Sequence, residues 1–188
     1  MSARLFVALE LPAGVRASLA AFGRAAADAD PALRAVGEDA LHVTLVFLGH
    51  RALEDVDLAA EAVGEAATGV AAPLLELGAP LWLSPRRPHV LTVALADPSH
   101  ALAALQAAVS VALVDALGIV PERRRFLPHV TVARVRRGAV PRRGRLPDPP
   151  WEEGQAFAGE AVTLYRSHLG GGPARYEPLL RVPLVAPS

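Results

Sequence analysis

Cysteine is absent from this chain of 188 residues, and aromatic side chains make up only 5% of it. Without cysteine there are no disulfides, no thiolate nucleophiles and no cysteine-based metal sites. Long apolar runs are missing too: none approaches the roughly 20 residues that span a bilayer, and the first residues carry no apolar signal segment. We therefore expect a cytoplasmic protein that does not enter a membrane, with a core built mostly from Leu, Val and Ala.

Lysine is also absent, so all 19 basic residues are arginines, and 19 acidic residues balance them. The arginines are unevenly distributed, because nine of them lie between Arg123 and Arg145, an interval that contains no acidic residue. A planar guanidinium suits phosphate oxygens, so the interval indicates a phosphate or nucleic-acid ligand. A solvated basic loop explains it equally well, because residues 136–150 are rich in Pro and Gly.

Apolar periodicity divides the chain into strands and helices. The predicted strands cover residues 3–9, 33–36, 41–49, 73–83, 89–96, 128–135, 155–167 and 175–185, and the predicted helices cover residues 12–29, 53–68 and 98–117. Gly49 is expected to end its strand, and Gly170–Pro173 to form a turn. The order predicts an α+β fold in one domain, residues 1–188, with two similar lobes around a central cleft.

Two tetrapeptides nearly repeat each other: His-Val-Thr-Leu at 42–45 and His-Val-Thr-Val at 129–132. Both lie in alternating apolar runs, and alternate side chains of a strand share a face. His42 therefore points the same way as Thr44, and His129 the same way as Thr131. If the two faces meet, the site holds two imidazoles and two hydroxyls.

This set of side chains suits acid–base chemistry on a phosphate. Histidine titrates near neutral pH, so one ring can carry a proton while the other accepts one. The threonine hydroxyls can hold the non-bridging phosphate oxygens. Arg134 could neutralise developing charge, but strict alternation puts it on the face opposite His129. It reaches the site only if the strand ends or bulges there.

The other histidines and the usual metal patterns offer weaker alternatives. In the stretch from His89 to Thr92 the two residues are three apart, so alternation separates them, and His50, His100 and His168 are expected on the surface. No His-Glu-x-x-His pattern occurs, and the spacing of Asp39, His42 and His50 matches no familiar ligand set. We expect no metal and no cofactor.

The chain resembles the 2H phosphoesterase superfamily, which is defined by two His-x-Thr-x motifs. It is similar in particular to RNA 2′,3′-cyclic phosphodiesterases, also called 2′-5′ RNA ligases. The resemblance rests on nearly the full length, in five segments: RLFVALELP, LHVTLVFLG, LSPRRPHVLTVAL, FLPHVTVARV and LYRSHLGGGPARYEPLLRVPL. It implies a bilobal, pseudo-two-fold fold of two antiparallel sheets with flanking helices, with the motifs facing each other across the cleft.

The resemblance also implies a reaction and its residues. Water opens a terminal 2′,3′-cyclic phosphate on RNA and leaves a 2′-phosphomonoester, with ATP-independent 2′-5′ ligation as a related activity. His42 would be the proton donor and His129 the proton acceptor. Thr44, Thr131 and Arg134 would bind substrate. The expected partner is RNA, and the chain is expected to act as a monomer.

Two other functions remain open from the sequence. The same fold could act on a small cyclic nucleotide, although the arginine-rich interval favours a polymer with several phosphates. A non-enzymatic RNA-binding module would need the arginines but not the histidines. It would also be expected to carry aromatic stacking platforms, and the chain has only nine aromatic residues.

Overall fold

The computed structural model describes residues 2–83, 88–120, 122, 124–142, 144, 146–168 and 174–187. Arg123, Arg143 and Arg145 of the basic interval, and the predicted turn at Gly170–Pro173, lie outside the described residues. The strands are β1 (Ser2–Leu9), β2 (Leu33–Ala35), β3 (Val43–Ala52), β4 (Leu74–Leu83), β5 (Val90–Ala96), β6 (His129–Val135), β7 (Ala156–Ala158), β8 (Ala161–His168) and β9 (Arg175–Pro183). The helices are α1 (Ala13–Ala29), α2 (Asp55–Ala67) and α3 (Ala101–Leu117), with a 3-10 turn η1 (Glu38–Ala40).

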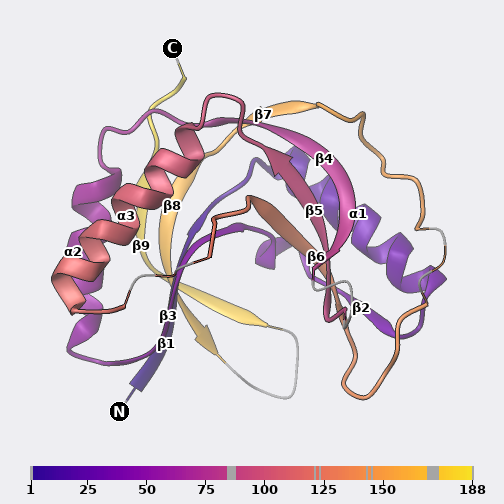
Figure 1. Ribbon diagram of the computed structural model, residues 1–188, viewed down its shortest axis with the longest axis horizontal. Helices are drawn as coiled ribbons and strands as arrows, with labels where there is room; N and C mark the ends of the chain where they lie inside the picture. Colours follow the sequence, from indigo (N-terminus) through magenta and orange to yellow (C-terminus); the bar gives the residue numbers. More distant parts are fainter. Residues whose placement is uncertain are drawn as a thin grey trace.

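The strands form one curved antiparallel sheet in the order β7-β4-β5-β6-β3-β1-β8-β9, with β2 paired to β6 (Figure 1). The predicted α+β class is therefore confirmed, but the two separate sheets are not found. Four strands on each side meet at β3 and β6, which pair through Val43 and Val130. This contact makes the sheet continuous and places the two motif strands side by side at its centre.

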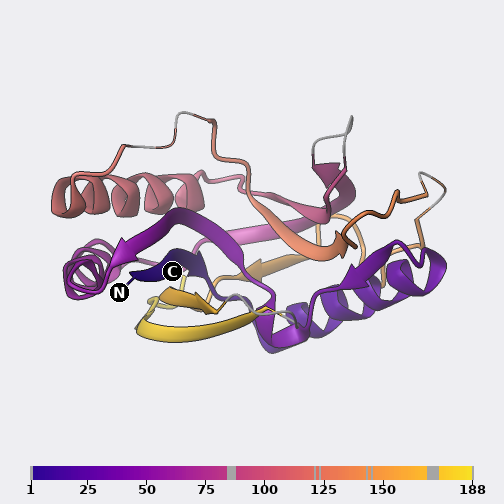
Figure 2. The same cartoon turned by 90° about the horizontal axis from the view of Figure 1, so that it is seen from below.

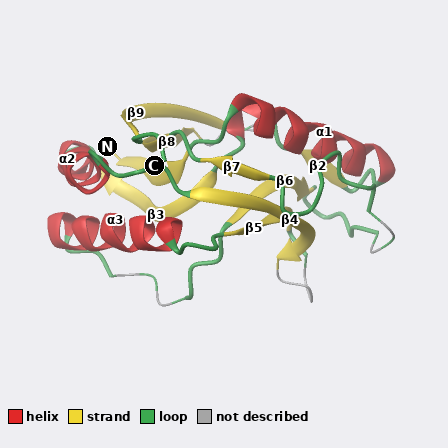
Figure 3. Ribbon diagram, turned by 90° about the horizontal axis from the view of Figure 1, so that it is seen from above, coloured by secondary structure: helices red, strands yellow, loops and turns green. Residues whose placement is uncertain are grey.

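Helices cover one face of the sheet at both ends. Alternation along β1 buries Leu5, Val7 and Leu9 completely, and they share one apolar cluster with residues of all three helices. Helix α1 packs on β2 and β6, whereas α2 and α3 pack on each other and on β3 (Figures 2 and 3). No helix among the described residues is long and apolar enough to cross a membrane.

Two predicted boundaries are wrong, each for a local reason. The strand of His42 does not end at Gly49 but continues to Ala52, because Gly49 adopts a φ of +70° next to a bulge in the pairing with β1. The long strand predicted at 155–167 is divided, because β7 pairs with β4 while β8 pairs with β1. Gly159 lies at the change of neighbour, where the amide of Gly159 bonds to Pro73 and that of Glu160 bonds to Glu10.

A bulge in β6 decides where Arg134 points. Thr131 pairs with Thr92 and Ala133 pairs with Leu91, so Val132 is an extra residue on its strand. An extra residue shifts the alternation by one position. Arg134 consequently shares a face with Thr131 and His129, which is the condition that the sequence required for it to reach the site.

Two neighbouring segments contact the Val132 carbonyl, the end of β2 and helix α1. Its oxygen accepts a hydrogen bond of 2.9 Å from the Val36 amide. Gly23 of α1 lies against the same oxygen, and a Cβ at Gly23 would be 2.5 Å from it. Glycine at this position therefore lets α1 approach the bulge closely.

We predict that Gly23→Ala lowers the free energy of unfolding by about 1–3 kcal/mol, because helix or bulge must shift to admit a methyl group. Gly14→Ala is the matched control in the same helix. Nothing lies within 4 Å of its Cβ position, so it should be neutral or slightly stabilising. Urea unfolding of both variants measures the difference. A Gly23→Ala protein as stable as the wild type would contradict the proposed close contact.

Candidate active site

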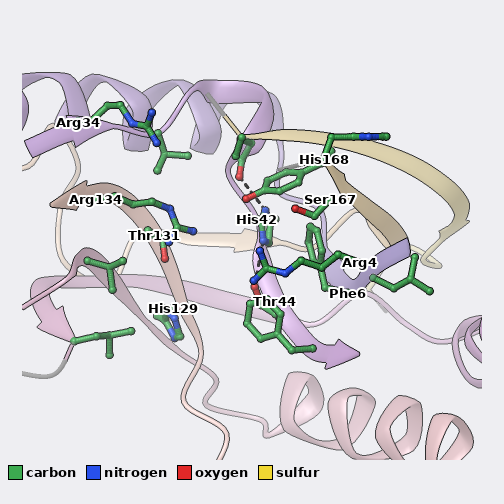
Figure 4. A pocket seen from close by; sticks show the side chains of 18 residues that line it. Arg4, Phe6, Arg34, His42, Thr44, His129, Thr131, Arg134, Ser167 and His168 are labelled. Atoms are coloured by element: carbon green, nitrogen blue, oxygen red, sulfur yellow. Dashed lines mark hydrogen bonds between the residues drawn. The ribbon is translucent and has the colours of Figure 1, made fainter. Parts of the chain in front are cut away.

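A cavity of about 460 Å³ lies where the two halves of the sheet meet, and it is within the size range of small-ligand sites. Its lining includes all five residues that the sequence singled out, namely His42, Thr44, His129, Thr131 and Arg134 (Figure 4). The pairing of β3 with β6 explains why the residues of both motifs line the same cavity. In an antiparallel register set by Val43 and Val130, His42 comes opposite Thr131 and Thr44 opposite His129. All four side chains then share one face.

Each histidine is oriented by a backbone carbonyl two residues before it. The Nδ1 atom of His42 lies 2.9 Å from the Ala40 carbonyl oxygen, and that of His129 lies 2.7 Å from the Leu127 oxygen. Since a carbonyl can only accept, Nδ1–H is the donor in both rings. Nε2 is then the atom left to exchange protons. In His42 it lies 3.2 Å from the Thr44 hydroxyl, which donates to it when the ring is neutral.

His42 sits among aromatic rings. Its ring centroid is 5.0 Å from that of Phe6 and 5.3 Å from that of Tyr176, and the Tyr176 ring meets it edge-on. Tyr165 stacks on Phe6 at 5.3 Å and extends the aromatic cluster. This packing partly buries His42 and fixes the plane of its imidazole.

Burial of His42 lowers its pKa from 6.5 to about 4, because a charged imidazolium loses its hydration among the rings. The hydrogen bond to Ala40 opposes this change, and the positive charges of Arg134 and His129 add to it. At neutral pH His42 is therefore uncharged unless an anion binds next to it.

Several cavity residues escaped the sequence reasoning. Arg34 of β2 pairs directly with Arg134 of β6, and Arg4 of β1 enters from the other half (Figure 4). Phe47 was missed although it follows Thr44 by three residues, as Arg134 follows Thr131.

His168, expected on the surface, is exposed but lies at the rim, where it bonds to Glu177 at 2.8 Å.

The cavity is strongly cationic. Its described lining contains three arginines and three histidines and no Asp or Glu. Such a surface attracts anions, and forked guanidinium groups favour phosphate. Within the described ranges no group of three or more His, Asp or Glu side chains is arranged to hold a metal ion.

The sequence model of the 2′-5′ RNA ligase superfamily matches residues 15–170. The chain belongs to this superfamily. The resemblance to 2H phosphoesterases found in the sequence is thus confirmed. Escherichia coli (strain K12) RNA 2′,3′-cyclic phosphodiesterase is 32% identical over 184 residues, which cover 95% of this chain and 94% of that protein.

Solved structures share the fold over nearly the whole chain. E. coli LigT complexed with 3′-AMP superposes with a TM-score of 0.76 at 26% identity and covers 98% of this chain and 99% of its own. TT0787 of Thermus thermophilus gives a TM-score of 0.77 at 24% identity, covering 96% and 97% of the two chains. The second likeness concerns the fold alone.

The lowered pKa of His42 makes stability depend on pH. The unfolded chain binds a proton at the ordinary pKa of 6.5, but the folded protein only near 4. The unfolded state therefore binds more protons in this window, and acidification from pH 7 to 4 should lower the free energy of unfolding, by at most about 3 kcal/mol from this residue. Urea unfolding across that window measures the slope. His42→Gln should flatten it and His50→Gln, at an exposed position, should not. Equal slopes in wild type and His42→Gln would contradict the assignment.

Proposed function

We propose that this protein is an RNA 2′,3′-cyclic phosphodiesterase that works by two-histidine acid–base catalysis without a metal. The observation that carries the proposal is the pair of imidazoles from distant motifs, whose Nδ1 atoms are tied to carbonyls and which line one cationic cavity. Water attacks the phosphorus, the bond from phosphorus to O3′ breaks, and a 2′-phosphomonoester remains. The relative named for this reaction supports the proposal through its 32% identity.

The proton transfers follow from the two rings. His129 removes a proton from the attacking water, and His42 gives a proton to the departing O3′. His42 is neutral in the empty cavity, so the bound phosphate anion must raise its pKa for it to hold this proton. Thr44 and Thr131 bond the non-bridging oxygens, and Arg134 neutralises the charge that develops on them.

An asymmetry of the lining supports His42 as the proton donor. Phe6, Phe47 and Tyr176 all come from the half of the sheet that carries His42. Phe47 is 69% exposed, so its ring is available to stack on a nucleobase. The nucleoside therefore lies on this side of the phosphorus, and its O3′ departs next to His42. Water enters from the opposite side, next to His129.

A single cyclic nucleotide is the second candidate substrate, because a cavity of about 460 Å³ has room for one nucleotide. Ligation would use the same geometry, with an RNA 5′-hydroxyl in place of water. We further propose that the chain is one bilobal domain over residues 1–188 with approximate two-fold symmetry. It would act as a monomer in the cytoplasm, and RNA would be its partner.

We predict that His42→Ala and His129→Ala each lower kcat for an RNA fragment with a 2′,3′-cyclic phosphate by about 10²-fold or more. Both proteins should unfold cooperatively at neutral pH. A control substrate with sulfur in place of O3′ has a leaving group that needs no proton. It should restore turnover to His42→Ala and not to His129→Ala, and the opposite rescue would exchange the two roles. A product that keeps its phosphate on O3′ would contradict the proposed bond cleavage.

Chelation separates this mechanism from metal-assisted hydrolysis. Because both proton carriers are side chains, excess EDTA should leave the rate of cyclic phosphate hydrolysis within about twofold of the untreated enzyme. The rate is measured before and after dialysis against EDTA. A loss of activity that zinc or manganese restores would favour a metal-bound water instead.

A further inference from the structure

We propose that Arg4 forms a second phosphate subsite, which holds the phosphodiester linking the terminal nucleotide of the RNA to the preceding one. The inference rests on the proposed function and deepens it, because it makes a polymer end rather than a free cyclic nucleotide the preferred substrate. Arg4 belongs to neither His-x-Thr motif, and the reaction at the cyclic phosphate does not use it.

Arg4 is a partly buried guanidinium in the cavity, and none of the described residues pairs with its side chain. Its backbone pairs with Ser167 of β8 and His50 of β3, so β1 places it at the centre of the half that carries His42. Its side chain projects into the cavity (Figure 4). Throughout the described part of the chain, no hydrogen bond or ion pair engages this side chain. A half-buried cation without a partner is costly, and an anionic ligand would compensate for it.

The other cationic groups in and near the cavity either surround the reacting phosphorus or pair with an acidic residue. Arg134 and His129 are the charges that act on His42, which places them around the reacting phosphorus. Arg34 lies across from Arg134 on the side where water enters. His168 is bonded to Glu177 at 2.8 Å, and Arg181 to Glu10 at the same distance. Arg4 is therefore the cavity cation available on the nucleoside side.

The chemistry of an RNA end supplies the matching anion. The terminal ribose carries the cyclic phosphate on O2′ and O3′, and its O5′ carries the phosphodiester to the preceding nucleotide. With the base stacked on Phe47, that phosphodiester stays in the half formed by β1 and β8. There Arg4 can bind it, and the Ser167 hydroxyl next to Arg4 provides a second donor. A cyclic mononucleotide has no such phosphate.

The test compares two substrates that differ in one charge: the dinucleotide ApA with a terminal 2′,3′-cyclic phosphate, and the same compound with a neutral methylphosphonate linkage. Wild type should prefer the charged linkage by about tenfold in kcat/KM, the usual value of one charge-assisted hydrogen bond. Arg4→Ala should abolish the preference, and Arg4→Lys should retain part of it. Arg24→Ala removes the same charge from the exposed side of α1 and should keep the preference intact.

A preference of equal size in wild type and Arg4→Ala would overturn the subsite, as would a wild type without any preference. Failure of the proposed function looks different, since wild type would then hydrolyse neither compound. In that case, calorimetry with adenosine 2′-monophosphate and ApA 2′-monophosphate decides. Tighter binding of the dinucleotide that is lost in Arg4→Ala supports the subsite, and the same ratio of dissociation constants in both proteins excludes it.

Discussion

The pairing of Val43 with Val130 is the contact on which the site depends. It is where β3 meets β6. On their other edges β3 pairs with β1 and β6 pairs with β5, and further along β6 the place of β3 is taken by β2. Antiparallel geometry at this point sets each histidine opposite the other motif's threonine. Two segments that lie far apart in the chain are thereby joined at one place, and that register sets the shared face of the two histidines and two threonines proposed to act on the phosphate.

The charge of the cavity and the protonation of His42 both change when a phosphate anion binds. The described lining is cationic, and the packing of Phe6 and Tyr176 around His42 further disfavours an imidazolium there. A phosphate anion reverses both effects, since it compensates for the arginines and stabilises the protonated ring. Binding and protonation are therefore coupled. In the proposed mechanism the substrate raises the pKa of His42 and so makes it competent as an acid, which restricts general acid catalysis to occupied sites.

Local patterns in the sequence were sufficient to predict the motif strands, the three helices and the faces of His42, Thr44, His129 and Thr131. They could not decide on which face of its strand Arg134 lies, because strict alternation assumes an uninterrupted ladder of paired residues and the bulge at Val132 interrupts it. The continuity of the sheet could not be predicted from local patterns either. It rests on one long-range pairing, that of Val43 with Val130, which leaves no local signal in the sequence. Arg4 and Arg34 were missed because a single arginine in a strand resembles any exposed residue until its neighbours are known.

A β-bulge follows the threonine of each motif, and the two bulges bring different side chains into the cavity. In β3 the extra residue after Thr44 is Leu45, and in β6 the extra residue after Thr131 is Val132. Each bulge turns the residue three positions after the threonine into the cavity, which is Phe47 in one half and Arg134 in the other. Equivalent positions thus present a ring on one side of the cavity and a cation on the other. Two nearly identical motifs become chemically distinct through this difference, and the proposed direction of nucleotide binding rests on it.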